Sequence, residues 1–239
     1  RFFPLWHGLR TLSLDIEMVP NRSCHVVRQL VSRYCAAVQQ PLCFSTSMHG
    51  ESVTLSSDGL VASAEASVNA FVCTNGVLPS FTWGRYFCVS VLRGSEHGGG
   101  GLCLGVCLPS VCLAELPSSV LRRHDAPILA LSLASGTWWF RGRKTPHTVP
   151  PLTACLEPGG PKAALWLHDD DVTVCSGDRL HATCPGLLRV FESSNQEGDV
   201  SGPAHVSAVS VNSLLGICDL VGRTTAVRIE ETHCPQSIQ

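Results

Sequence analysis

The sequence is short of charge, and of lysine in particular. Only 15% of its 239 residues are charged, against about a quarter in an ordinary soluble protein, and lysine occurs only at Lys144 and Lys162. Binding of nucleic acid needs clustered Lys and Arg, so the scattered basic residues and the net charge of −2 argue against that class of partner. The low charge also predicts that part of the surface is covered by a partner or a larger assembly.

Long apolar segments are missing as well. A membrane-spanning helix needs about 18–20 consecutive apolar residues, and the chain has no run of that length. No secretory signal is visible. The chain begins at Arg1 rather than at a methionine, so we expect it to be a fragment or a processed product.

Signatures of the common enzyme classes are also missing. The chain has no G-x-S-x-G elbow, no P-loop and no H-E-x-x-H motif. No Lys-Ser or Lys-Thr follows the glycine run at 98–101, which is better explained as a flexible hairpin loop. His124 and Asp125 are sequence neighbours, which face opposite ways on a strand. We therefore expect no enzymatic activity and no cofactor, with an uncharacterised hydrolase as the remote alternative.

Cysteine is the residue type present in excess, with thirteen copies. An odd count at irregular spacing is a poor disulfide framework, and there is no C-x-x-C pair for a zinc site. The run Asp169, Asp170 and Asp171 lacks the ligand spacing and closing Glu of a calcium loop. We expect free thiols in a reducing, cytoplasmic compartment and no bound metal; disulfides and a metal site are the alternatives.

Short apolar runs with strand periodicity fill the chain after residue 42. They are bounded by turn residues at intervals of about 8–12 residues, which is typical of an all-β antiparallel sandwich. The candidate strands are residues 53–55, 60–66, 71–73, 86–92, 102–108, 129–133, 137–141, 165–167, 172–174, 187–191, 214–220 and 224–230. Residues 144–162 hold five prolines and are expected to form a long surface loop.

The N-terminal part has a different pattern. Val26, Leu30, Tyr34 and Val38 recur at helical spacing, and Pro41 follows. We expect residues 1–41 to be an extension with one amphipathic helix, residues 42–231 to be the sandwich, and residues 232–239 to be a tail. The helix either packs on the sandwich or links it to a partner.

Several short pieces occur in a distinctive order across residues 42–230. They are His49-Gly50, the 53–59 hairpin, Asn75-Gly76, the 83–87 strand, the 102–106 strand, the 138–143 segment, Gly177-Asp178-Arg179 and Asp219-Leu220-Val221-Gly222. In this order they resemble the neuralized homology repeat. Val221 stands where that family has a tyrosine.

The resemblance implies a neuralized- or SPRY-like β-sandwich that acts as a protein-interaction module in ubiquitin-ligase biology. Such a module recruits a substrate or partner protein, including ubiquitin ligase components, while a separate subunit or domain transfers ubiquitin. The low charge and the linker-like N-terminal part resemble one repeat of a multi-repeat neuralized-like protein. The alternative is a SPRY-like or lectin-like sandwich that binds another peptide or a glycan.

Aromatic and arginine residues dominate interface energetics, and they gather near residue 140. Adjacent strand residues face opposite ways, and the resemblance places Trp138 in the core and Trp139 outward. Arg141 and Arg143 share the parity of Trp139, so the three are predicted to form one partner-binding face. The alternative is that the arginine stems only cover apolar surface.

Overall fold

The computed structural model describes residues 42–65, 70–81, 84–94, 101–109, 119, 126–189, 214–220, 222 and 224–230. The chain divides into two units, Arg1–Pro41 and Leu42–Gln239, and all described residues belong to the second. The helix predicted within residues 26–38, the first residue of the 83–87 piece and the tail at 232–239 lie outside the described residues.

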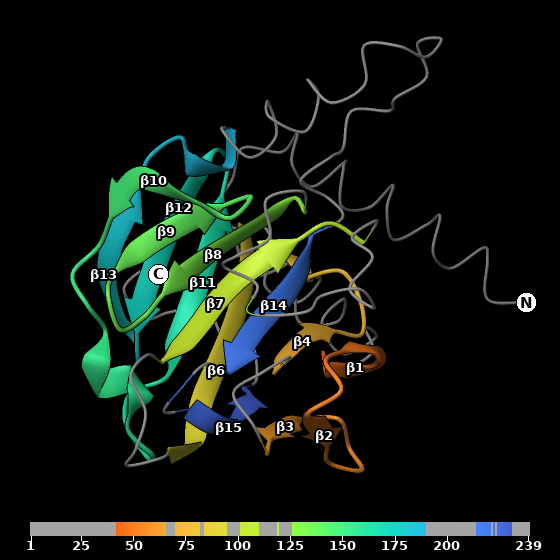
Figure 1. Ribbon diagram of the computed structural model, residues 1–239. Helices are drawn as coiled ribbons and strands as arrows, with labels where there is room; N and C mark the ends of the chain where they lie inside the picture. The colour runs from red at the N-terminus through yellow and green to blue at the C-terminus, as the bar shows by residue number, and fades with distance from the viewer. Residues whose placement is uncertain are drawn as a thin grey trace, which may run out of the picture. The chain divides into compact units, whose positions relative to one another are not determined.

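Two antiparallel sheets form the fold, as the sequence predicted (Figure 1). The first sheet has seven strands, in the spatial order β1 (Phe44–His49), β4 (Phe71–Thr74), β14 (Leu215–Leu220), β7 (Leu102–Cys107), β8 (Ile128–Ser132), β9 (Thr137–Phe140) and β10 (Arg143–Thr148). The second has eight, in the order β13 (Arg179–Cys184), β12 (Asp171–Ser176), β11 (Ala163–His168), β6 (Gly84–Gly94), β15 (Thr224–Ile229), β3 (Val61–Ala64) and β2 (Val53–Leu55), with β5 (Ser80–Phe81) paired to β6.

The core lies between the two sheets and follows from the alternation of the strands. In β6, for example, Phe87, Val89 and Val91 are buried in the main core, while Leu92 is 42% exposed. Trp138 on β9 is completely buried in the same core. Each large apolar side chain buried in this way stabilises the fold by about 1.5–3 kcal/mol relative to exposure.

Short turns close the predicted hairpins. Between β2 and β3, the Asp58 carboxylate accepts hydrogen bonds from the Ser56 hydroxyl at 2.5 Å and from the Leu60 amide at 3.0 Å. Gly59 follows with a φ of 68°, a conformation that glycine adopts without strain. The hairpin expected at residues 53–66 is confirmed by the pairing of Val53 with Ala64.

The last two strands of the chain lie inside the sheets and not at their edges. β14 is inserted between β4 and β7, and β15 between β6 and β3 (Figure 1). Gly216 in β14 allows the sheets to approach, because a Cβ there would lie 2.9 Å from ring atoms of Phe87. The strands predicted at 214–220 and 224–230 are thus confirmed, in central positions.

Two predictions about local structure are wrong. Residues 144–162 are not one surface loop, because they contain most of β10 and the short 3-10 helix η2 (Thr153–Leu156), and Leu152 and Cys155 are buried. β10 tolerates Pro146 because it is an edge strand, where a missing N–H breaks no ladder.

The second error concerns residues 187–189, predicted to begin a strand. They are helical. The Gly186 amide donates to the Asp171 carboxylate at 2.9 Å and the Leu188 amide to the Asp170 carbonyl at 2.9 Å. These contacts turn the chain back on the β11–β12 hairpin and bury Leu187 and Leu188 together.

Nine described cysteines are free thiols, seven of them in strands of the two sheets, with Cys43 just before β1 and Cys155 in η2. The seven are Cys73, Cys88, Cys103, Cys107, Cys175, Cys184 and Cys218. The Sγ atoms of Cys73 and Cys107 are 3.8 Å apart. Their strands both flank β14, so the backbones are two strand spacings, roughly 9–10 Å, apart. A disulfide requires Cα atoms within about 7 Å, so this pair cannot form one without moving a strand.

Over the residues that the structure describes, no helix has the length and apolar character of a membrane span.

Candidate functional site

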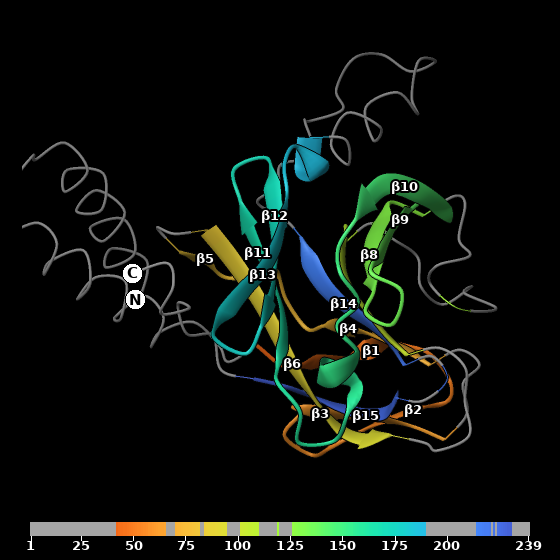
Figure 2. The same cartoon turned by 90° about the vertical axis from the view of Figure 1, so that its left-hand side faces the viewer.

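Loops from both sheets meet at one end of the sandwich, which we call the hairpin end: the turns β9–β10 and β11–β12, residues 75–78 and residues 185–189. In the first sheet, the Arg141 amide donates to the Ile128 carbonyl at 3.3 Å, and the Leu78 amide donates to the carbonyl of Leu214, just before β14, at 2.8 Å. Arg85 joins the layers there, because its Nη1 donates to the Leu78 carbonyl at 2.5 Å and its backbone pairs with Leu167 of β11. Figure 2 shows β8–β10 and β11–β13 in opposite layers.

The turn between β9 and β10 is a two-residue hairpin loop. Phe140 pairs with Arg143, leaving Arg141 and Gly142 as the central residues, with φ angles of 47° and 68°. Positive φ at both positions is what a type I′ turn requires, and Asn-Gly is the usual sequence. An arginine in this conformation costs about 1–2 kcal/mol relative to its preferred backbone, so the fold holds Arg141 at the tip against its local preference.

Two cation–aromatic contacts order this hairpin. The Arg141 guanidinium lies 5.5 Å from the centroid of the Phe140 ring. Across the hairpin, Lys144 pairs with Trp139, and its Nζ lies 5.5 Å from the centroid of the indole. Such contacts contribute about 0.5–1 kcal/mol at exposed sites. Trp139 is half-buried under this lysine, whereas Trp138 points into the core as predicted.

The structure does not place Trp139, Arg141 and Arg143 on one strand face. β9 ends at Phe140, and the turn at Arg141 and Gly142 interrupts the alternation. Arg143 begins β10 opposite Phe140, and Lys144, which the prediction omitted, is the residue that faces Trp139. The signal available in the sequence was Gly142, preceded by a polar residue and directly following the apolar run Trp138–Phe140, because a polar residue before glycine is common in tight hairpin turns.

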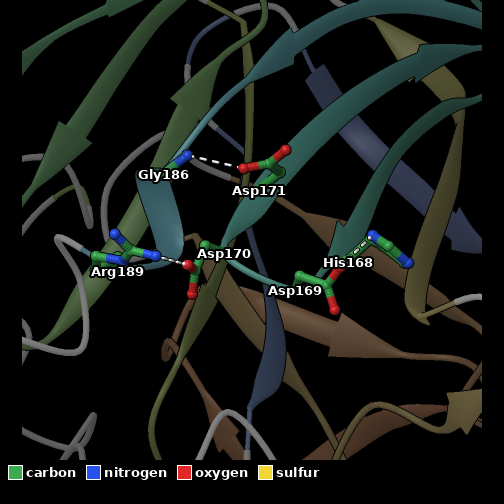
Figure 3. Close-up of polar contacts among 6 residues, drawn as sticks. All are labelled: His168, Asp169, Asp170, Asp171, Gly186 and Arg189. Atoms are coloured by element: carbon green, nitrogen blue, oxygen red, sulfur yellow. Dashed lines mark hydrogen bonds and ion pairs between the residues drawn. The ribbon is translucent and has the colours of Figure 1, made fainter.

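The β11–β12 turn at the same end is acidic (Figure 3). His168 Nδ1 and the Asp169 carboxylate are 3.2 Å apart, Asp170 is paired with Arg189, and Asp171 accepts from the Gly186 amide. Asp169 has a φ of 50°, and 83% of its side chain is exposed. The three carboxylates therefore point to three separate partners, and no described group of three His, Cys, Asp or Glu residues could hold a metal ion.

The buried thiols are poorly suited to nucleophilic chemistry. Burial raises the pKa of Cys88 to about 12 and that of Cys175 to about 11. Burial also raises the pKa of Cys103, with a further contribution from the Asp219 carboxylate. Because only the thiolate attacks or binds metal, these cysteines act as small apolar core residues near neutral pH.

Comparison with known proteins identifies the architecture. A protein-family model described as Neuralized matches residues 44–231. The crystal structure of the Drosophila melanogaster Neuralized NHR1 domain is similar, at 15% identity and a TM-score of 0.55, with 81% of this chain and 100% of that chain covered. The SPRY domain of human HERC1 is also similar, at 10% identity and a TM-score of 0.51, with 80% and 98% covered. A comparison with curated protein sequences found no match.

Proposed function

The chain belongs to the Neuralized family, and on that basis we propose that it recruits a substrate or partner protein within a ubiquitin-ligase-associated protein. The neuralized and SPRY-type sandwich is a protein-interaction fold. In this proposal the module binds and does not catalyse, so a separate subunit or domain transfers ubiquitin. We place the protein in the cytoplasm, as one repeat of a multi-repeat chain.

The observation that carries the proposal is the β9–β10 tip. Arg141 is held at positive φ, Arg143 is exposed, and Lys144 is stacked on Trp139. Strained backbone conformations persist where the surrounding structure fixes them, and they cluster at ligand-binding sites. Rigid aromatic and arginine side chains are also the residues that most often dominate binding energy. The proposed partner-binding residues therefore remain Trp139, Arg141 and Arg143, with Lys144 added.

Affinity capture from cytosol with the full chain as bait, read by mass spectrometry, tests the proposal. We expect recovery of ubiquitin-pathway or adaptor proteins, and loss of that recovery when Arg141→Gly is combined with Arg143→Ala. Glycine replaces Arg141 because it removes the guanidinium and adopts the positive φ without strain, whereas alanine would remain strained there. Capture that is unchanged in the double variant would exclude this hairpin as the binding site.

A glycan is the alternative ligand for a lectin-like sandwich. Binding of the full chain to a glycan array, with no protein captured from cytosol, would favour it over protein recruitment.

A further inference from the structure

The β9–β10 hairpin is rich in positive charge. Between residues 126 and 156 the sequence contains Arg141, Arg143 and Lys144 but no Asp or Glu. The ion pairs seen among the described residues join Lys162 to Glu230, His168 to Asp169 and Arg189 to Asp170, so Arg143 and Lys144 take part in none of them. Both are exposed. This concentration of cations occurs in a chain whose net charge is −2.

From this we propose that the hairpin tip, formed by Trp139, Arg141, Arg143 and Lys144, binds an acidic segment of a partner protein. The inference deepens the proposed function, on which it rests, by assigning the chemistry of the partner. The planar guanidinium groups suit carboxylates, which they bind in a bidentate manner. The Lys144–Trp139 stack provides an ordered cation beside an aromatic surface for the stem of a Glu side chain.

Side chains rather than backbone provide the contact. β10 is the edge of its sheet, but Pro146 in its middle has no N–H to donate to an added strand. The register against β9 also shifts between Lys144 and Thr148, which disturbs the ladder that a new strand would extend. Recognition therefore depends on the carboxylates of the ligand and is sensitive to salt.

An anionic membrane would carry the same charge as the ligand, but the neighbouring hairpin disfavours it. Asp169, with 83% of its side chain exposed, lies at the same end of the sandwich in the second sheet. A flat anionic surface pressed on that end would meet both hairpins, whereas a peptide is narrow enough to contact the basic one alone. The acidic turn then disfavours ligands that extend beyond the β9–β10 tip, through like-charge repulsion.

Fluorescence anisotropy with a labelled peptide of alternating Glu and Ser tests the inference, with a Gln-Ser peptide as the uncharged control. We expect the full chain to bind the Glu peptide only, and Arg143→Gln with Lys144→Gln to weaken binding by roughly 5–10-fold. The matched control is Arg93→Gln with Arg228→Gln, which removes two exposed cations from the second sheet. Its affinity should stay within about twofold of the wild type at ~0.15 M salt.

Three results would overturn the inference: no binding of the Glu peptide, an equal loss in both variant pairs, or binding to phosphatidylserine vesicles that is lost with Arg143→Gln and Lys144→Gln. Repeating the capture experiment with the same variants separates the two proposals. A ligase component captured equally by the wild type and by Arg143→Gln with Lys144→Gln overturns the acidic-segment inference and leaves the proposed function standing. Glu-peptide binding without any protein captured by the wild type overturns the proposed function instead.

Discussion

Gly136 and Gly159 share a backbone conformation but have opposite surroundings. Their φ angles are 66° and 74°. A Cβ added to Gly136 would lie 1.8 Å from the backbone carbonyl oxygen of Val149, whereas a Cβ on Gly159 would have no heavy atom within 4 Å. An alanine at Gly159 would meet only the backbone strain of positive φ, whereas an alanine at Gly136 would meet the same strain and a steric clash.

Gly136→Ala should lower the free energy of unfolding by at least about 3 kcal/mol, because the β8–β9 turn must move away from Val149. Gly159→Ala should cost only about 1 kcal/mol, the penalty for an L-residue at positive φ. Urea denaturation monitored by fluorescence measures both. Equal losses in the two variants would contradict this account of Gly136.

The adjacent tryptophans offer a second contrast at the residue scale. Trp138 is completely buried, so Trp138→Ala should cost about 3–5 kcal/mol through lost burial and the cavity that remains. Trp139 is half-buried, and Trp139→Ala should cost about 1 kcal/mol. Thermal unfolding of the two variants, with Trp138→Phe as a milder core change, checks the order. A larger loss at Trp139 would contradict the assignment of faces.

Strand parity predicted opposite faces for Trp138 and Trp139, and the family resemblance placed Trp138 inward, but neither predicted the geometry of Arg141 and Arg143. Parity within a strand is a local property, and it held as far as Phe140. Arg141 and Gly142 then form a tight turn, beyond which the strand runs back with Lys144 opposite Trp139. Basic and aromatic side chains do gather at this hairpin, as predicted from the sequence. Which of them share a strand face could be determined only from the pairing register of β9 and β10.

At the scale of elements, Glu230 links three segments of the second sheet. Its carboxylate lies 2.8 Å from Lys162 Nζ, just before β11, and accepts from the Ser90 hydroxyl of β6 at 2.6 Å. Burial pushes the pKa of Glu230 up, but the hydrogen bonds from Lys162 and Ser90 outweigh it and hold the pKa below its ordinary value. The ionised form is therefore the one that stabilises the fold.

A depressed pKa gives stability that is present above the unfolded-state pKa of about 4.3 and lost as the pH falls through the folded-state value. The difference in free energy of unfolding between wild type and Glu230→Gln should thus be constant from about pH 5 to 9 and shrink below about pH 4. Urea titrations at several pH values measure it. A difference that grows in acid would contradict the assigned sign.

Strand positions were largely predictable, and the exceptions have physical causes. Period-two alternation located the strand around residues 224–230, and short apolar runs bounded by turn residues located those around residues 86–92 and 102–108, although β7 is buried on both faces. β10 was missed because its Pro146 was expected to rule out any strand, whereas proline rules out only a central one and β10 lies at the edge of its sheet. Residues 187–189 were misread because their helical turn is fixed by contacts with Asp170 and Asp171, which are distant in sequence. Strand order is equally nonlocal.

At the scale of the whole molecule, the thiols report on the opening of the sandwich. Cys73, Cys103, Cys107 and Cys218 are at most 3% exposed, and burial raises the pKa of Cys73, Cys103 and Cys218. Iodoacetamide near pH 8 should leave these four unmodified in the native protein and alkylate them in denaturing urea. Cys43, half-buried at the edge of β1, should react first among the described cysteines. Peptide mapping by mass spectrometry gives the order, and rapid native modification of Cys107 would contradict the fold.

The central position of β14 and β15 has a consequence for biosynthesis. β4 pairs with β14, and β3 pairs with β15. Each of these early strands therefore has a partner on one side only until residues 215–229 leave the ribosome. While this domain is being synthesised, the nascent chain must keep the open edges of β4 and β3 from pairing with other chains until β14 and β15 emerge. A premature stop codon between β13 and β14 would then yield two sheets that each lack an internal strand, rather than a shortened sandwich, and such a product is a substrate for chaperones and proteases.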